Sequence, residues 1–144
     1  MASRREQVLD AVAALWRTAL PDGDVRRNPA GAPRVGPGGL VVIRDGDPGP
    51  PDIDLSPLRY NYSHPIPCEV MAVAPDDETG AEMVDDMLSR FGALLQADRT
   101  LGGLVDFLDV EAPTSDDITL SGAQATRLAD IFVVAQYATA NPLT

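Results

Sequence analysis

The chain has 144 residues, of which 44% are hydrophobic and 5% aromatic, and its 22 acidic residues outnumber its 11 basic ones, giving a formal net charge of −11. This length and composition predict one globular domain spanning residues 1–144. No apolar run approaches the roughly 20 residues that a membrane-spanning helix needs, so no membrane partner is expected. The acidic excess argues against binding of a nucleic-acid backbone, and the few aromatic residues argue against a stacking surface for single strands.

The charge is unevenly distributed along the chain. Residues 1–60 contain eight arginines and eight acidic residues, whereas residues 61–144 contain three arginines and 14 acidic residues. The N-terminal sequence MASRREQVLD has no apolar segment typical of a secretory signal, and the single Cys68 cannot form an intramolecular disulfide. We therefore expect synthesis in the cytoplasm and a fold held together by packing.

The first part of the chain is expected to form a helix, a long loop and two strands. Apolar residues recur at three- and four-residue steps from Ser3 to Leu20, which predicts an amphipathic helix packed on a sheet. Residues 28–39, NPAGAPRVGPGG, predict a loop, and because no Gly-Lys-Ser/Thr follows, these glycines do not predict a phosphate site. The apolar run Leu40–Ile43 predicts a central strand covered on both faces, and residues 52–56, DIDLS, predict a short strand.

The segment YNYSHPIPCEV, which follows, contains the only histidine and the only cysteine of the chain. Pro65 and Pro67 exclude a helix, and the alternation of apolar and polar residues predicts a long strand. His64 and Cys68 then share one face but lie about 13 Å apart, too far for a nucleophile and its base. We expect Cys68 to pack as a small apolar residue and His64 to lie at the strand surface. The prolines cannot donate hydrogen bonds, so the strand is expected to bend or to lie at a sheet edge beside them.

A second helix is predicted by an unbroken apolar stripe, which comprises Met83, Val84, Met87, Leu88, Phe91, Leu94 and Leu95. We interpret this stripe as core packing rather than as a binding groove. Acidic residues crowd the first turn of this helix, where the helix dipole favours negative charge. Thr79 and Glu82 have the spacing of a capping box, and Asp76 or Asp77 could equally supply the N-cap.

The rest of the chain is expected to contain a tight turn at residues 99–104, a strand at 105–111, a turn or loop at PTSDD and a last strand at 125–139. In the last strand both alternating faces are apolar near Phe132. We therefore expect this strand to be central, or one of its faces to be buried by another subunit. The candidate subunit interface comprises Ile131, Val133 and Tyr137.

The order of these elements predicts an α+β fold. We expect a mainly antiparallel sheet of about four to six strands with two amphipathic helices packed on one face. Two helices cannot cover both faces of such a sheet, so an uncovered apolar face is a candidate interface.

The sequence predicts no catalytic, cofactor-binding or metal site. There is no lysine for a Schiff base, and the carboxylate clusters fall at predicted helix caps and turns. Asp45 and Asp47 could bind a divalent ion, but they lack the downstream glutamate and the oxygen spacing of a calcium loop. These absences favour a protein that binds other proteins and carries no cofactor.

Five segments together carry a resemblance to a known family: VRRNP, GGLVVIRDGDPG, LSPLRYNYSH, ADRTLGGLVDFLDVEAP and YATANPLT. They resemble the tail terminator, or tail completion, proteins of long-tailed bacteriophages and of gene transfer agents. The resemblance spans nearly the whole chain and lies in turn and strand segments, not in a catalytic motif. At Pro65 and Pro67 the sequence departs from the family pattern.

The resemblance implies a small α+β subunit of a hexameric ring in the tail neck of a virion, made in the cytoplasm of a bacterial host. Such a ring would end polymerisation of the tail tube protein, receive the head-completion (stopper) protein and let double-stranded DNA pass without specific binding. The candidate contacts with the tube or neck are the arginines of the locally basic surface, Arg26, Arg27, Arg34 and Arg44. The candidate acidic lining of the lumen comprises Glu78, Glu82, Asp85 and Asp86, whose charge would repel phosphates.

Two alternative functions remain open. One is a small non-catalytic regulator whose acidic half engages a basic protein surface. The other is an enzyme that handles acyl-CoA, because some members of the family carry an acyl-CoA transferase label. That second alternative would require His64 and Cys68 to converge on a substrate.

Overall fold

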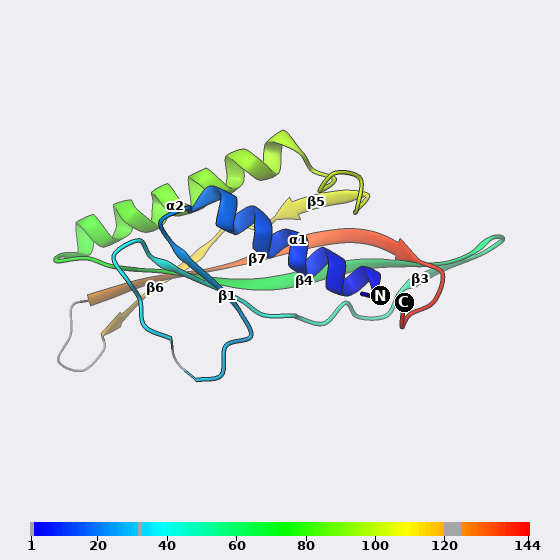
Figure 1. Ribbon diagram of the computed structural model, residues 1–144, viewed down its shortest axis with the longest axis horizontal. Helices are drawn as coiled ribbons and strands as arrows, with labels where there is room; N and C mark the ends of the chain where they lie inside the picture. Colours follow the sequence, from blue (N-terminus) through cyan, green and yellow to red (C-terminus); the bar gives the residue numbers. More distant parts are fainter. Residues whose placement is uncertain (1, 32, 120–124) are drawn as a thin grey trace.

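The computed structural model describes residues 2–31, 33–119 and 125–144 and has an α+β fold (Figure 1). The helices are α1 (Arg4–Ala19) and α2 (Asp77–Ala97). The strands are β1 (Asp24–Arg27), β2 (Leu40–Ile43), β3 (Asp52–Leu55), β4 (Leu58–Val73), β5 (Phe107–Val110), β6 (Thr114–Thr119) and β7 (Ala125–Thr139). Within the described ranges these seven strands form one sheet, which is antiparallel except where β1 pairs with β2. The predicted fold class is confirmed, with more strands than expected.

The long strands β4 and β7 form the centre of the sheet. They pair antiparallel from Tyr60 opposite Thr139 to Val73 opposite Thr126. On the other edge of β4, β3 pairs with its first residues and β2 with its last part. On the other edge of β7, β6 pairs near its start and β5 near its end. Each long strand therefore has two short partners on its outer edge.

One face of the two long strands carries the hydrophobic core. Even-numbered residues of β4, such as Ile66 and Val70, are buried together with the odd-numbered β7 residues opposite them. Both helices contribute buried side chains to this same core. The rings of Trp16 from α1 and Phe91 from α2 stack with centroids 3.8 Å apart, which ties the two helices together. The odd-numbered residues of β4 and the even-numbered residues of β7 form the opposite face, here called the open face.

Each helix begins at a side-chain cap. The Ser3 hydroxyl accepts a hydrogen bond from the Glu6 N–H at 3.2 Å, and the Asp76 carboxylate accepts one from the Thr79 N–H at 2.7 Å. These bonds satisfy donors that have no partner inside the helix. Asp76 is thus the N-cap of α2, which was one of the predicted alternatives. No helix in the described part of the chain is long and apolar enough to cross a membrane.

Pro65 and Pro67 lie inside β4, at a place where one edge of this strand has no strand partner. β3 pairs with residues 58–61 and β2 with residues 68–71, so residues 62–67 are left between them. The Pro67 carbonyl faces this edge, because it accepts a hydrogen bond from the Arg44 N–H at 2.9 Å. The missing N–H groups of both prolines point the same way, since main-chain groups alternate between the two edges of a strand. The predicted position of this strand at a sheet edge is therefore wrong, because β4 is central. The reason for the prediction still holds locally, since no strand pairs with the prolines on the side where their N–H groups are missing.

Two strands differ from the sequence predictions. β1 was not expected, and β6 occupies residues where a turn or loop was predicted. Both are strands at the edge of the sheet. An edge strand tolerates polar side chains, so the apolar alternation that identifies inner strands is absent from the sequences DVRR and TSDDIT.

Candidate assembly surfaces

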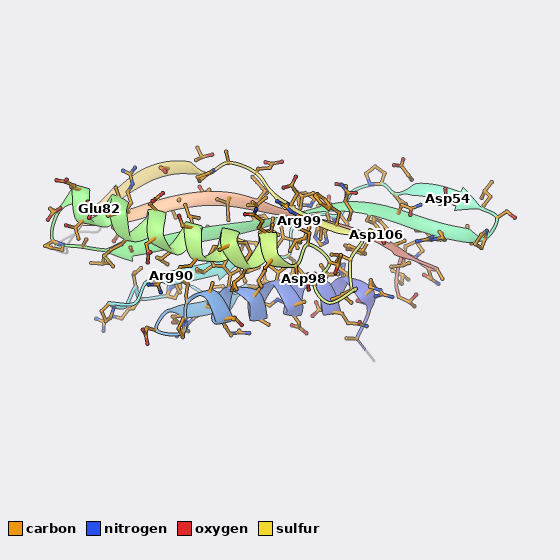
Figure 2. All side chains as sticks on the ribbon, turned by 90° about the horizontal axis from the view of Figure 1, so that it is seen from above. Asp54, Glu82, Arg90, Asp98, Arg99 and Asp106 are labelled. Carbon is orange, nitrogen blue, oxygen red and sulfur yellow. The ribbon has the colours of Figure 1, made fainter. Side chains whose placement is uncertain are left out.

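The hairpin formed by β3 and the first residues of β4 projects beyond both helices along the long axis of the molecule (Figures 1 and 2). We call residues 52–61 the arm. Ile53 pairs with Tyr60 and Leu55 pairs with Leu58, so these four side chains share one face of the arm. That face continues the buried face of the sheet, because Tyr60 and Leu58 belong to the even-numbered residues of β4. On the arm, however, no helix covers it.

The apolar side chains of the arm are correspondingly exposed, with relative accessibilities of 52% for Ile53, 81% for Leu55 and 47% for Leu58. The two strands of the arm are also joined by a side chain on its reverse face. The Asn61 amide donates to the Asp52 carbonyl at 3.1 Å and to the Asp54 carboxylate at 3.0 Å. The arm therefore presents an apolar surface on an internally bonded hairpin.

Arginines surround the base of the arm. A shallow pocket of about 360 Å³ is lined by Arg4, Leu58, Arg59, Ala138, Thr139, Ala140 and Thr144. Arg4 donates a hydrogen bond to the Leu104 carbonyl at 3.3 Å, while Arg5 and Arg59 are exposed. Because Arg59 stands opposite Asp54 on the reverse face, the apolar side of the arm has its basic margin at the base, from Arg4 and Arg5.

A second apolar patch lies on the open face of the sheet. Phe107 and Phe132 have relative accessibilities of 39% and 41%, and Val134, which stands beside Asp109 of β5, is half-buried. On the neighbouring β4 this patch is continued by Pro65 and Pro67, the cross-strand partners of Val134 and Phe132. We call these five apolar residues, Pro65, Pro67, Phe107, Phe132 and Val134, the sheet patch.

The sheet patch corrects the predicted subunit interface. Ile131, Val133 and Tyr137 were expected to face a neighbouring subunit, but they are 3%, 0% and 3% exposed and belong to the internal core. The sequence shows two apolar faces on β7, and the helices cover the one that was assigned to the interface. The surface available for a partner is the other face, which carries Phe132.

The margin of the sheet patch carries more acidic than basic residues. The Arg99 guanidinium lies 5.2 Å from the centroid of the Phe107 ring and pairs with Asp109 at 3.3 Å. Glu69 and Asp130 lie directly opposite each other on the open face. Glu69 is paired only loosely, with the Arg44 guanidinium at 3.7 Å, and Asp130 is exposed. Like charges directly opposite each other destabilise a strand pair. A cation from a partner molecule would therefore stabilise this part of the sheet.

The predicted acidic lumen residues share one face of α2. Glu78, Glu82, Asp85 and Asp86 are all exposed, and their spacing places them opposite the buried stripe that contains Phe91. Asp86 forms an ion pair with Arg90 at 3.0 Å, one helical turn away. Figure 2 shows Glu82 at the end of the molecule opposite the arm, on which Asp54 lies.

The predicted arginine contacts fall into two groups. Arg27 is committed to its own chain, because its guanidinium contacts Asp10 at 2.7 Å and both Glu6 and Asp45 at 3.1 Å. The hydrogen bond with Glu6 raises the pKa of Arg27, and the pKa of Asp45 is lowered, first by the Asn28 amide and then by Arg27. The predicted contact of Arg27 with the tube or neck is therefore corrected, because its guanidinium binds carboxylates of its own chain.

The other three arginines are on the surface. Arg26 forms an exposed ion pair with Asp24 at 2.9 Å, and Arg44 lies near Glu69. Arg34 is exposed in the loop between β1 and β2. No contact in the structure tests their predicted role, which stays a prediction.

His64 and Cys68 are both buried and have separate partners. The Asp45 carbonyl lies 2.6 Å from His64 Nε2 and can only accept, so Nε2 carries the proton and Nδ1 accepts from the Tyr137 hydroxyl at 2.9 Å. Burial lowers the pKa of His64, and it raises the pKa of Cys68 to about 12 although the Trp16 indole acts in the opposite direction. The expected surface position of His64 is wrong, because this side chain is fully buried. Cys68 packs as an apolar residue, as predicted, and its thiol contacts the Ile66 carbonyl at 3.7 Å.

In the described residues no group of three or more histidine, cysteine, aspartate or glutamate side chains is arranged to hold a metal ion. The exposed features of the described chain are the arm, the sheet patch and the acidic face of α2. The arm was missed as a functional element in the sequence. Its alternating apolar residues look like those of any strand, and their exposure depends on where the helices end.

Comparison with known proteins gives similarities to solved structures but none to a family model or a curated protein. The structure is similar to a solved chain from the virion of a native gene transfer agent particle, with a TM-score of 0.42 and 15% sequence identity. The similarity covers 92% of this chain and 90% of that chain.

Proposed function

We propose that the chain is a structural protein of a phage or gene-transfer-agent tail. Copies of it form a ring, hexameric as the sequence resemblance implies, at the head-proximal end of the tail tube. The ring ends tube polymerisation and joins the tube to the head-completion protein. The observation that carries the proposal is the arm, which extends the core face of the sheet into solvent without a covering element.

An uncovered apolar arm is typical of a subunit whose partner is absent. Soluble monomers rarely expose contiguous apolar surface unless it serves an interaction. Because the two strands of the arm are already joined through Asn61, little conformational entropy is lost when the arm docks. The proposal involves no covalent chemistry, and it uses neither the buried His64 nor the buried Cys68.

In this proposal the acidic face of α2 lines the lumen of the ring. Glu78, Glu82 and Asp85 are exposed on one side of the helix. Carboxylates lining a channel repel the phosphates of double-stranded DNA, so the genome passes without binding. Arg26, Arg34 and Arg44 are proposed to contact the tube or the head-completion protein, on surfaces away from this face.

Deletion of the coding sequence in a particle-producing host tests the proposal. We expect full heads separated from tails, and tubes of variable length in electron micrographs, with normal particles restored by the wild-type gene. Joined particles with tubes of normal length in the deletion strain would exclude the proposed role. A permanently monomeric protein that leaves tube length unchanged would favour the regulator alternative.

A matched pair of variants tests the lumen. Charge reversal at Glu82 and Asp85 should leave ring and tail assembly intact and reduce DNA delivery, because arginines at those positions would bind passing phosphates. Charge reversal at Asp106, which is exposed before β5 and lies away from Glu82 and outside the arm, is the control for a general effect of charge. If both reversals reduce delivery equally, the acidic face of α2 does not line the lumen.

A further inference from the structure

We infer that the arm of one copy packs on the sheet patch of the next copy, so that the same head-to-tail contact is repeated around the assembly. This inference rests on the proposed function only in requiring that copies of the chain associate. It goes further by naming both surfaces of the contact and the direction in which the contact runs.

The exposed apolar side chains are segregated into two surfaces. Apart from Leu143, the large apolar side chains with high exposure in the described ranges are Ile53, Leu55 and Leu58 on the arm and Phe107 and Phe132 on the sheet patch. Strand pairing places these two sets on opposite faces of the sheet, because Leu58 and Tyr60 have even numbers in β4 whereas Phe132 pairs with Pro67. The two surfaces therefore cannot cover each other within one molecule, but they can do so between two copies.

The charges around the two surfaces are complementary. Arg4 and Arg5 of α1 lie at the base of the arm, where Arg4 lines the same pocket as Leu58 and Arg5 lies beside Tyr62. Arg59 stands opposite Asp54 on the reverse face of the arm.

The sheet patch is bordered by three carboxylates, Glu69, Asp109 and Asp130, and by two arginines, Arg44 at 3.7 Å from Glu69 and Arg99 at 3.3 Å from Asp109, so its border has an excess of negative charge. An arginine brought in by a neighbouring arm would relieve the like-charge contact between Glu69 and Asp130, so the sheet patch is better suited to the arm than to a second sheet patch.

The contact is heterologous, because it joins two different surfaces of identical chains. Each copy then keeps a free arm at one side and a free sheet patch at the other, and closure of the chain of contacts gives a ring. A symmetric dimer through two arms would instead bring Arg4 and Arg5 of both copies together and leave the sheet patch exposed. Complementarity of both apolar surface and charge thus favours the head-to-tail arrangement.

Disulfide trapping between two variants tests this contact directly. Leu55→Cys protein is mixed with Phe132→Cys protein under mild oxidation, and the native Cys68 is left in place because its buried thiol is protonated and unreactive. We expect a disulfide-linked heterodimer as the main product. The control is Asp54→Cys mixed with Phe132→Cys, since Asp54 is exposed on the reverse face of the same strand. The inference is overturned if the control crosslinks as efficiently, or if dimers of Leu55→Cys with itself predominate.

Two charged variants test whether the contact holds the assembly together. Leu55→Glu places a charge on the apolar face of the arm and leaves the sheet patch unchanged. Phe132→Glu places a charge on the sheet patch and leaves the arm unchanged. Neither substitution removes a buried side chain, so circular dichroism should show both variants folded. In native mass spectrometry each variant alone should be monomeric, whereas their mixture should give a heterodimer and nothing larger. Assembly of either variant alone to the wild-type size would refute the contact.

The outcome can be separated from that of the tail proposal. Trapping of Leu55→Cys with Phe132→Cys, together with normal tails in the deletion strain, would support the contact and exclude the tail function. Overlong tubes in the deletion strain, together with failure of the trapping, would support the tail function and exclude this contact.

Discussion

Replacement of Arg27 by methionine should destabilise the fold without altering a partner surface. The guanidinium joins three separate parts of the chain, since Glu6 and Asp10 belong to α1, Arg27 to β1 and Asp45 to the segment after β2. Methionine keeps the length and apolar stem of the side chain and removes all three ion pairs. The expected effect is therefore loss of stability rather than loss of tail assembly.

The size of the effect follows from the exposure of the side chains. Arg27 is 20% exposed, whereas its partners Glu6, Asp10 and Asp45 are 41%, 66% and 45% exposed. Exposed pairs each contribute about 0.2–1 kcal/mol, and the low exposure of the shared guanidinium favours the upper part of this range. The three pairs together should then contribute about 2 kcal/mol, a substantial part of the roughly 5–15 kcal/mol by which a domain is stable.

Urea denaturation followed by tryptophan fluorescence measures this difference. Trp16 is the only tryptophan, and it is fully buried against Phe91, so its emission reports unfolding of the core. Arg26→Met is the matched control, because Arg26 lies next in the strand, is 55% exposed and has one exposed partner. Its effect should stay within about 0.5 kcal/mol. If Arg27→Met is no less stable than Arg26→Met, the assignment of Arg27 to the fold rather than to a partner is wrong.

Three further predictions concern the segment beside β4 and the two buried side chains on it. Gly46→Ala should lower the free energy of unfolding by about 1–3 kcal/mol, since the added Cβ meets the Pro65 carbonyl at a positive φ of 68°. Gly49→Ala, with a φ of 69° and no atom near its added Cβ, should cost clearly less, and equal costs would exclude the clash. The Cys68 thiol should not react with an aromatic disulfide reagent at pH 8 until urea unfolds the chain, because burial raises its pKa to about 12; rapid reaction of the native protein would contradict the structure. Because burial lowers the pKa of His64 below 6.5, the unfolded state binds more protons below that pH, so the free energy of unfolding should fall as the pH drops from 7 to 5. This fall should be smaller in His64→Gln, and an unchanged pH dependence would show that His64 is not responsible.

Elements that bury a periodic apolar face could be predicted from the sequence. The stripe that includes Met87 and Phe91 predicts α2, and the run Leu40–Ile43 predicts a doubly covered strand, which β2 is. The alternation of residues along β7 also predicts correctly which side chains share a face: Ile131, Val133 and Tyr137 lie on one face and Phe132 on the other. In each case the pattern arises from the same physical cause as the structure, namely burial of one or both faces.

Features that depend on distant partners could not be predicted. His64 is buried because Asp45 and Tyr137, separated from it by 19 and 73 residues, satisfy both of its ring nitrogens. The role of Arg27 likewise depends on carboxylates far away in the sequence. For β7, the sequence offers two apolar faces and no sign of which one the helices cover, so the interface was assigned to the wrong face. The exposure of Leu55 could not be foreseen either, since it depends on where α1 and α2 end.

The two prolines of β4 also bear on how the chain avoids unwanted polymerisation. Residues 62–67 have no β-strand partner on one side, and there the segment after β2 covers the edge: the Arg44 N–H donates to the Pro67 carbonyl, and Gly46 lies against the Pro65 carbonyl. An uncovered strand edge is an ordinary site for adding a strand from another molecule. Of the three residues whose main-chain groups face this side, Ser63 alone has an N–H to offer, because Pro65 and Pro67 have none. An incoming strand would have to displace the covering segment and would still find too few donors to build a ladder. A chain that must associate in one defined geometry is thereby protected from fibrous association along its own sheet.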